Sequence, residues 1–201
     1  MKHLFLPLIA ALCICGAKAH AQTTPTVANP DYCFLVSAYA GANSQASKDM
    51  GIEGVWKKNV YQDLFVNVGL SLAMDYTKNI NKLTNSRNMF EVGVPVQLEY
   101  CRLAFGKSSF YGLVGVAPVF YTTLSAKAWS SSAGHIVKDT KKNGCVFSPT
   151  LEGGMNIPLQ NTLIHLGVFY KSKVNCTPDG YNVYRHVAGV NFIGLKAGVI
   201  F

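Results

Sequence analysis

A carboxylate and an imidazole, Glu152 and His165, stand in two neighbouring stretches of the chain that alternate apolar and polar residues. Residues 157–160 between these stretches contain a proline and predict a turn. With the turn there, Asn156 would pair with Asn161, and Glu152 would lie directly opposite His165 on the same face. A carboxylate beside an imidazole could act as a general acid–base pair. The chain has no Gly-x-Ser-x-Gly motif to supply a nucleophile, so we interpret the pair as a satisfied polar contact inside the protein.

The other reactive residue types give weaker indications. After residue 22 the cysteines are Cys33, Cys101, Cys145 and Cys176, which lack C-x-x-C spacing and leave three disulfide connectivities open. Cys145 begins one predicted strand and Cys176 follows the next, so the topology favours a Cys145–Cys176 bridge, with buried free thiols as the alternative. We predict no catalytic residue, no cofactor-binding residue and no metal site, because the remaining histidines are isolated.

Long strands must position these residues. Every second residue from Leu64 to Tyr76 is apolar, and the residues between them are small or polar apart from Phe65. A strand places successive side chains on opposite faces, so this stretch of 13 residues has one apolar and one polar face. The pattern recurs over 90–102. Such lengths match the ~9–11 residues with which a tilted strand crosses a bilayer.

Turn signals divide the chain into eight segments and predict an all-β fold, an eight-stranded antiparallel up-and-down transmembrane β-barrel. Short and longer connections alternate, as in barrels with short periplasmic turns and longer extracellular loops. The predicted strands are 32–42, 49–57, 61–77, 88–103, 109–123, 145–156, 161–173 and 184–201. The predicted short turns are 57–60, 104–108 and 157–160, and the predicted loops are 43–48, 77–87, 123–144 and 173–183.

The same alternation assigns each strand residue to a face, with Val68, Leu98 and Leu195 outward and Glu99 and Lys196 inward. A buried unpaired charge is costly, so we predict an interior ion-pair network that plugs the lumen. Its members would be Glu53, Asp75, Glu91, Glu99 and Glu152 opposed by Lys57, Lys171, Lys196, His165 and His186. A soluble lipocalin-like binding barrel also alternates, but its outer face would carry far more charge.

Two further features concern the strands. Pro95, Pro118 and Pro149 lie inside predicted strands, and each removes a ladder donor. We expect bulges or strand ends at these prolines, where the register is least determined. Aromatic residues near strand ends, Tyr100 and Tyr111 among them, predict girdles at the membrane interfaces.

The chain begins with a segment unlike the rest. A basic start, an apolar run and a small-x-small site predict a signal peptide over 1–21, followed by a lead over 22–31 and the barrel over 32–201. The formal net charge is +8. Because the basic residues are scattered and not interleaved with aromatics, they favour contact with anionic lipid headgroups or phosphate-rich glycolipid over nucleic acid.

The last predicted strand carries the most specific resemblance. Leu195 and Val199 belong to an alternating apolar series that ends at Phe201, similar to the terminal strand of bacterial outer-membrane barrels, where it is the signal read by the barrel-assembly machinery. Together with 89–100 and 110–121, this strand resembles the small porin-like outer-membrane β-barrel family of Bacteroidota, an eight-stranded OmpA-transmembrane-like barrel. The resemblance implies an outer-membrane location, contact with outer-membrane lipid and lipopolysaccharide, assembly by that machinery, and no shared catalytic residues.

The leading functional hypothesis is a non-enzymatic, monomeric outer-membrane barrel with a structural or adhesive role. Its extracellular loops would meet an outside partner, and 126–143 is the longest such segment. The alternatives are a narrow porin or transport barrel, a lipid A-modifying enzyme that uses Glu152 and His165, and the soluble binding barrel.

Overall fold

The computed structural model describes residues 31–43, 47–78, 86–105, 108–130, 135–138, 143–175 and 190–201. The predicted signal peptide, Cys176 and His186 lie outside these residues. The strands are β1 Tyr32–Ala42, β2 Lys48–Tyr61, β3 Leu64–Lys78, β4 Ser86–Gly93, β5 Val96–Phe105, β6 Ser108–Ser130, β7 His135–Lys138, β8 Asn143–Leu159, β9 Thr162–Asn175 and β10 Val190–Ile200. No helix in the described part of the chain is long and apolar enough to cross a membrane.

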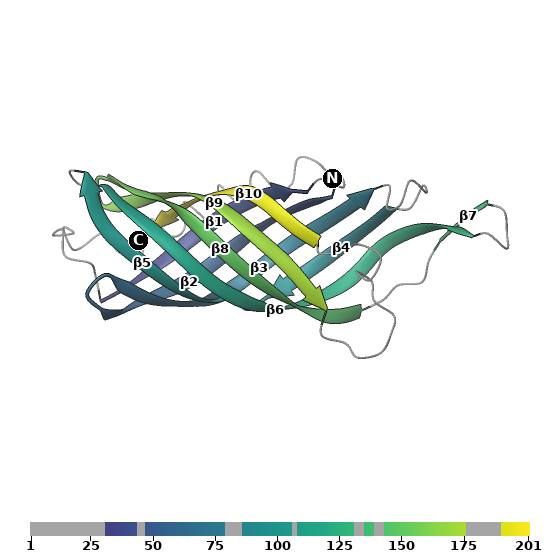
Figure 1. Cartoon of the computed structure of the whole chain (residues 1–201), viewed down its shortest axis with the longest axis horizontal. Coiled ribbons are helices and arrows are strands. Elements are labelled where there is room, and N and C mark those ends of the chain that lie inside the picture. Colours follow the sequence, from purple (N-terminus) through teal and green to yellow (C-terminus); the bar gives the residue numbers. More distant parts are fainter. Residues whose placement is uncertain are drawn as a thin grey trace.

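The strands close into a barrel (Figure 1). Each wall strand pairs antiparallel with its neighbours along the chain, and β1 pairs with β10 from Leu35↔Ile200 to Ala42↔Ile193. β4 and β5 together occupy one position in the wall, because both pair with β3 on one side and β6 on the other. Apart from β7, which pairs with β6, the described strands therefore form a ring of eight wall positions. The predicted fold class is confirmed.

The two faces of the wall are distributed as the alternation predicts. Val68, Leu98 and Leu195 are 40%, 43% and 68% exposed on the outside. Glu99 is fully buried inside, and Lys196 is 5% exposed. A soluble barrel would have the opposite arrangement, with charges in water and apolar side chains in a closed core.

Two of the predicted short turns are wrong. Residues 57–60 belong to β2 and the chain turns at Gln62 and Asp63, while β8 continues to Leu159 and the chain turns at Gln160 and Asn161. In each turn the first loop residue has a positive φ, 45° at Gln62 and 52° at Gln160, as in a type II′ hairpin. Glycine usually marks that position, so these turns carry no sequence signal. Pro158 does not mark a turn and belongs to β8.

The prolines disturb the ladders in different ways. Pro95 follows the end of β4, which confirms the expected strand end. Pro118 and Pro149 instead remain within β6 and β8, and the β6–β8 register passes both prolines without a shift, so the expectation of a bulge or strand end is wrong there. Pro149 interrupts the hydrogen-bond ladder to the neighbouring strand. The β8–β9 pairing stops at Phe147↔Val174 and resumes at Thr150↔Lys171. Between the end of β4 and the start of β5, the Val94 N–H donates a hydrogen bond to the Pro118 carbonyl oxygen at 3.0 Å.

The predicted loop over 123–144 is also wrong in part. β6 continues to Ser130 and pairs with β7 through Lys127↔Lys138 to Ser130↔His135. This hairpin projects beyond the rest of the barrel, at the right of Figure 1. Trp129, Ile136 and Val137 have high strand propensity, and polarity alone did not reveal a second hairpin.

The backbone at Gln160 generates a prediction for stability. A non-glycine residue with positive φ is strained, so Gln160→Gly should raise the free energy of unfolding by about 0.5–1 kcal/mol. Urea unfolding of the refolded protein in lipid vesicles measures the change. The neighbouring Asn161→Gly is the control and should give no gain, since the φ of Asn161 is not positive. An equal gain from both variants would contradict the turn geometry.

Candidate functional site in the barrel interior

Charged side chains fill the barrel from end to end. In the described strands six carboxylates, four lysines and His165 face inward. They form three groups along the barrel axis. The turn-side group is Lys57 and Glu99, the middle group is Glu53, Glu152, His165 and Lys196, and the loop-side group is Asp49, Asp75, Glu91, Lys171 and Lys173.

The turn-side group joins three strands. Lys57 of β2 donates to Glu99 Oε1 of β5 at 2.6 Å, and the Asn67 amide of β3 donates to Glu99 Oε2 at 2.8 Å. The Lys57 ammonium also lies 5.5 Å from the centre of the Phe65 ring. Both oxygens of the buried carboxylate are thus bound, which offsets the cost of removing the pair from water.

In the middle group a single lysine bridges two carboxylates. Lys196 of β10 donates to Glu53 Oε1 of β2 at 2.7 Å and to Glu152 Oε2 of β8 at 3.1 Å. Glu152 Oε1 accepts a hydrogen bond from the Tyr111 hydroxyl at 2.7 Å and lies 3.0 Å from Nε2 of His165. Glu152 therefore connects four strands of the wall through its side chain.

The second ring nitrogen of His165 is also bound. Nδ1 lies 2.8 Å from Oδ1 of Asn156, and the Tyr111 ring stacks on the imidazole with centroids 4.4 Å apart. The predicted outward position of Tyr111 in an aromatic girdle is wrong, because Tyr111 is 5% exposed and faces the interior. The sequence contains a signal for this, since Tyr111 shares its face with the small residues Gly115 and Ala117, whereas Val114 and Val116 share the other face with Phe110.

The structure brings Glu152 and His165 together by a different register from the predicted one. His165 pairs with Asn156, and Glu152 pairs with Phe169, so the two are not directly opposite. The predicted pairing is wrong because the chain turns at Gln160 and Asn161 and not over 157–160. The Gly154↔Gly167 pair lies between the strand positions of Glu152 and His165, and the two side chains meet across these glycines, along the barrel axis. A Cβ at Gly167 would lie 2.9 Å from Glu152 Oε1 and collide with the Tyr111 hydroxyl, so the absence of a side chain there makes room for the contact.

The loop-side group contains two members that the sequence reasoning missed, Asp49 and Lys173. Lys173 donates to Asp75 Oδ2 at 2.8 Å and to Glu91 Oε1 at 2.7 Å, and lies 3.7 Å from Asp49 Oδ1. Lys171 donates to Asp49 Oδ2 at 2.9 Å. Asp49 and Lys173 were placed at the ends of predicted strands, but their parity with Glu53 and Lys171 would have identified them as inward.

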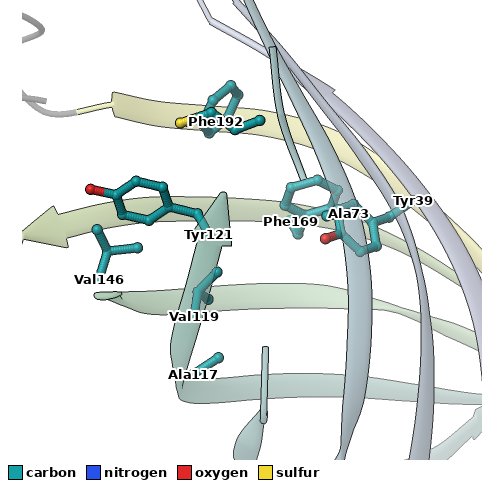
Figure 2. Packing of buried hydrophobic residues seen from close by; sticks show 9 residues of the cluster. Tyr39, Ala73, Ala117, Val119, Tyr121, Val146, Phe169 and Phe192 are labelled. Carbon is teal, nitrogen blue, oxygen red and sulfur yellow. The ribbon is translucent and has the colours of Figure 1, made fainter. Parts of the chain in front are cut away.

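Apolar side chains surround this loop-side group. Figure 2 shows Tyr121, Val119, Phe169 and Phe192 extending into the barrel from strands far apart in the sequence. Phe169 contacts Tyr39 edge to face with ring centroids 5.6 Å apart. These rings exclude water from the ion pairs and occupy the space between them.

Little empty space remains inside. A cavity of about 30 Å³ lies among Glu53, Gln97, Glu152 and Lys196, which is room for only a few water molecules. The side chains of Glu152 and His165 are 1% and 0% exposed. Both members of this acid–base pair are therefore buried among the described strands.

The remaining predicted site residues lie elsewhere. Cys145 carries a free thiol near the start of β8, and Cys176 lies outside the described residues, so their disulfide stays a prediction. Leu195 is on the outer face of β10. Phe201 is joined to Phe34 of β1 by two backbone hydrogen bonds of 2.9 and 3.2 Å. The role of Leu195, Val199 and Phe201 as an assembly signal stays a prediction.

Comparison with known proteins gives structural likeness without sequence similarity. No protein-family model matches the chain, and no curated protein matches it significantly in sequence. Among solved structures, Neisserial surface protein A (NspA) has a TM-score of 0.49 at 12% identity, over 84% of this chain and 94% of that one. The N-terminal β-barrel domain of Pseudomonas aeruginosa OprF has a TM-score of 0.42 at 10% identity, over 85% and 98%. The fold assignment rests on the strand pairings, and the resemblance to the Bacteroidota family stays a prediction.

The lysine bridge in the middle group generates a prediction. Lys196→Met would leave Glu53 and Glu152 buried without their shared cation, and breaking a buried pair in this way should cost about 3–5 kcal/mol of unfolding free energy. Urea unfolding in vesicles measures the loss. The control Lys58→Met removes an exposed lysine from the outside of β2 and should change stability by less than about 0.5 kcal/mol. A loss below about 1 kcal/mol for Lys196→Met would show that the bridge contributes little.

Proposed function

We propose that this protein is an integral β-barrel of a bacterial outer membrane with a closed lumen, acting as a structural or surface-interaction protein through its loop end. The observation that carries this proposal is the inverted distribution of side chains, apolar outside and charged inside. The predicted signal peptide and the terminal strand ending at Phe201 agree with export and outer-membrane assembly.

The outer surface has the chemistry of a lipid-facing belt. Exposed aliphatic side chains follow one another around the wall, whereas soluble monomers rarely expose a large contiguous apolar patch. Hydrocarbon is the solvent that fits such a surface, and closure of the sheet leaves no unpaired edge within it. The most exposed members in the middle of the strands are Leu70, Val114, Leu151, Val168 and Leu195.

Aromatic side chains lie at both rims of this belt. Trp56, Tyr100 and Phe110 are exposed towards the short turns. Tyr76 and Tyr170 are exposed towards the loops. Aromatic rings with an apolar body and a polar edge prefer the headgroup region, so these two sets mark the height of the hydrocarbon layer.

The interior favours a role that uses neither catalysis nor conduction. The side chains of Glu152 and His165 are at most 1% exposed, which argues against the lipid A-modifying enzyme. The ion-pair groups and aromatic rings occupy the lumen, which argues against a standing pore. The loop end, where the β6–β7 hairpin extends the wall, is the part of the molecule that we propose meets a partner.

The proposed location generates a prediction that cell fractionation tests. The protein should co-sediment with the outer membrane and should migrate faster on an SDS gel unheated than boiled, because a closed barrel resists SDS. Recovery in a soluble fraction, or one mobility under both conditions, would overturn the proposal.

Depth-dependent variants provide the matched control. Val168→Lys lies mid-belt and should cost about 2–4 kcal/mol, whereas Thr122→Lys, on the same face near the loop end, should cost about 0–1 kcal/mol. Equal costs would indicate that water and not hydrocarbon meets this face.

The filled lumen generates a prediction for conductance. The purified, refolded protein should give no steady current in a planar bilayer, because the three ion-pair groups and the aromatic rings beside them occupy the lumen of the described strands. A steady current with linear voltage dependence would favour the porin alternative. Heat-modifiable mobility of the same sample shows that the protein tested is folded.

A further inference from the structure

His165 lies on β9 with its ring fully enclosed by other residues. Its side chain is 0% exposed, so the protein groups around the ring must satisfy both of its nitrogens. Nε2 lies 3.0 Å from Oε1 of Glu152, and Nδ1 lies 2.8 Å from Oδ1 of Asn156. A neutral imidazole has one N–H donor and one bare acceptor nitrogen, whereas an imidazolium donates from both. The atoms opposite the ring therefore decide which form the folded barrel contains.

The atom opposite Nε2 of His165 can only accept a hydrogen bond. Glu152 Oε1 already accepts from the Tyr111 hydroxyl at 2.7 Å, and Oε2 accepts from the Lys196 ammonium at 3.1 Å. Donors on both oxygens are the surroundings of an ionised carboxylate, which has no proton of its own to donate. Nε2 must then be the donor in its contact with Glu152.

The atom opposite Nδ1 is determined by a second series of contacts. The single proton of the Cys101 thiol is directed at Ser109 Oγ, 3.3 Å away. The amide nitrogen of Asn156, Nδ2, donates to the Cys101 sulfur at 3.5 Å, which leaves the amide oxygen facing His165. Turning the amide over would place two acceptors, its oxygen and the sulfur, against each other. Nδ1 therefore also faces an acceptor and must donate.

The balance of charge in the middle group agrees with a doubly protonated ring. Glu53 and Glu152 share a single lysine, Lys196, and an uncompensated buried charge is costly. A positive His165 supplies a second cation and makes these four side chains neutral together. The ring also stacks on Tyr111 with centroids 4.4 Å apart and an interplanar angle of 23°, an arrangement that favours a cation.

We propose that His165 is held as an imidazolium in the folded barrel and that its two N–H donors hold β9 against β8, so that losing one proton weakens the middle of the wall. With a neutral ring, a bare nitrogen would face an oxygen lone pair, either on Glu152 or on Asn156. The two carboxylates of the middle group would also be left with one lysine between them. This proton-dependent contact belongs to the wall and goes beyond the role proposed for the loop end.

The direction of the pH effect follows from the unfolded chain, in which a histidine loses its charge at about pH 6.5. Above that pH the folded barrel holds a proton that the unfolded chain has released, so the free energy of unfolding falls as the pH rises. The stabilising contribution of His165 is complete below about pH 6.5 and is lost with increasing alkalinity.

Other titratable groups in this half of the lumen must be separated from His165. The titratable and charged side chains that face it from the surrounding strands are Cys33 of β1, Glu53 and Lys57 of β2, Glu99 and Cys101 of β5, Tyr111 of β6, Glu152 of β8 and Lys196 of β10. Among these the thiols are the groups that ordinarily release a proton nearest to the alkaline side of neutral pH. A control for Cys101, which contacts Asn156, is therefore part of the test.

NMR of ¹⁵N-labelled histidine tests the protonation state directly. The sample is the refolded full chain in detergent micelles with His3→Gln, His20→Gln, His135→Gln and His186→Gln, so that His165 is the sole histidine. At about pH 8, where a solvent-exposed histidine is neutral, both ring nitrogens should show a one-bond coupling to a proton. One protonated and one bare nitrogen would overturn the proposal.

Urea unfolding in lipid vesicles between about pH 6 and about pH 9 measures the consequence for stability. The midpoint of the parent should fall by roughly 1 M more than that of His165→Gln, because glutamine keeps an amide donor and has no proton to lose. Cys101→Ser removes the thiol, keeps a polar partner for Asn156 and should retain the pH dependence of the parent.

Two outcomes of the unfolding series would contradict the proposed proton. One is an equal pH dependence of the parent and the Gln variant, and the other is a response of the Ser variant that is as flat as that of the Gln variant. Heat-modifiable mobility shows which variants are folded. If His165→Gln does not fold, the NMR measurement alone decides, because the sample for it retains His165.

Discussion

The structure depends on the pairing of charges that cannot reach water. A narrow closed barrel with a lipid-compatible exterior has one place for its polar side chains, and that place is a lumen with almost no solvent. Each buried charge must then be matched by a counter-charge from another strand. Lys196 between Glu53 and Glu152, and Lys173 between Asp75 and Glu91, meet this requirement by serving two carboxylates each. The charges that make the interior costly also tie distant strands to one another.

This constraint explains why residue identity is less restricted on the outer face of the wall than on the inner face. Outside, alternate positions need only be apolar and of strand-forming shape, so Val, Leu and Ile can exchange with little consequence. Inside, each charged side chain of the described strands has a defined partner, often through a defined oxygen or nitrogen. The Glu152 carboxylate, for example, meets Tyr111, His165 and Lys196, and Gly167 must stay without a side chain for these contacts to form. The interior is therefore the part of this protein in which residue identity is most narrowly defined.

The sequence predicts the faces well and the turns poorly, and the reason is physical. Facing follows from alternation, which one strand displays by itself, so Val68 and Glu99 could be placed from the sequence. A turn at Gln62 or Gln160 depends on the pairing of whole strands, which forces a positive φ on a residue that does not prefer it. The contact between Glu152 and His165 could be anticipated as a pair, but its path across Gly154 and Gly167 depends on the register that the turn sets. The β6–β7 hairpin was missed because Trp129 and Ile136 stand in a stretch whose polarity is typical of loops.

The pairing of β1 with β10 has a consequence for how this chain acquires its structure. These strands are the first and last of the barrel, and their register joins Leu35 to Ile200. Loop-closure entropy opposes contacts so distant along the chain, and their abundance slows folding. Until β1 and β10 pair, the growing sheet has two edge strands with unpaired backbone N–H and C=O groups. These edges can pair with other polypeptides as readily as with each other. The folding barrel is therefore best protected from aggregation when a catalyst or a template covers these edge strands until β1 and β10 pair.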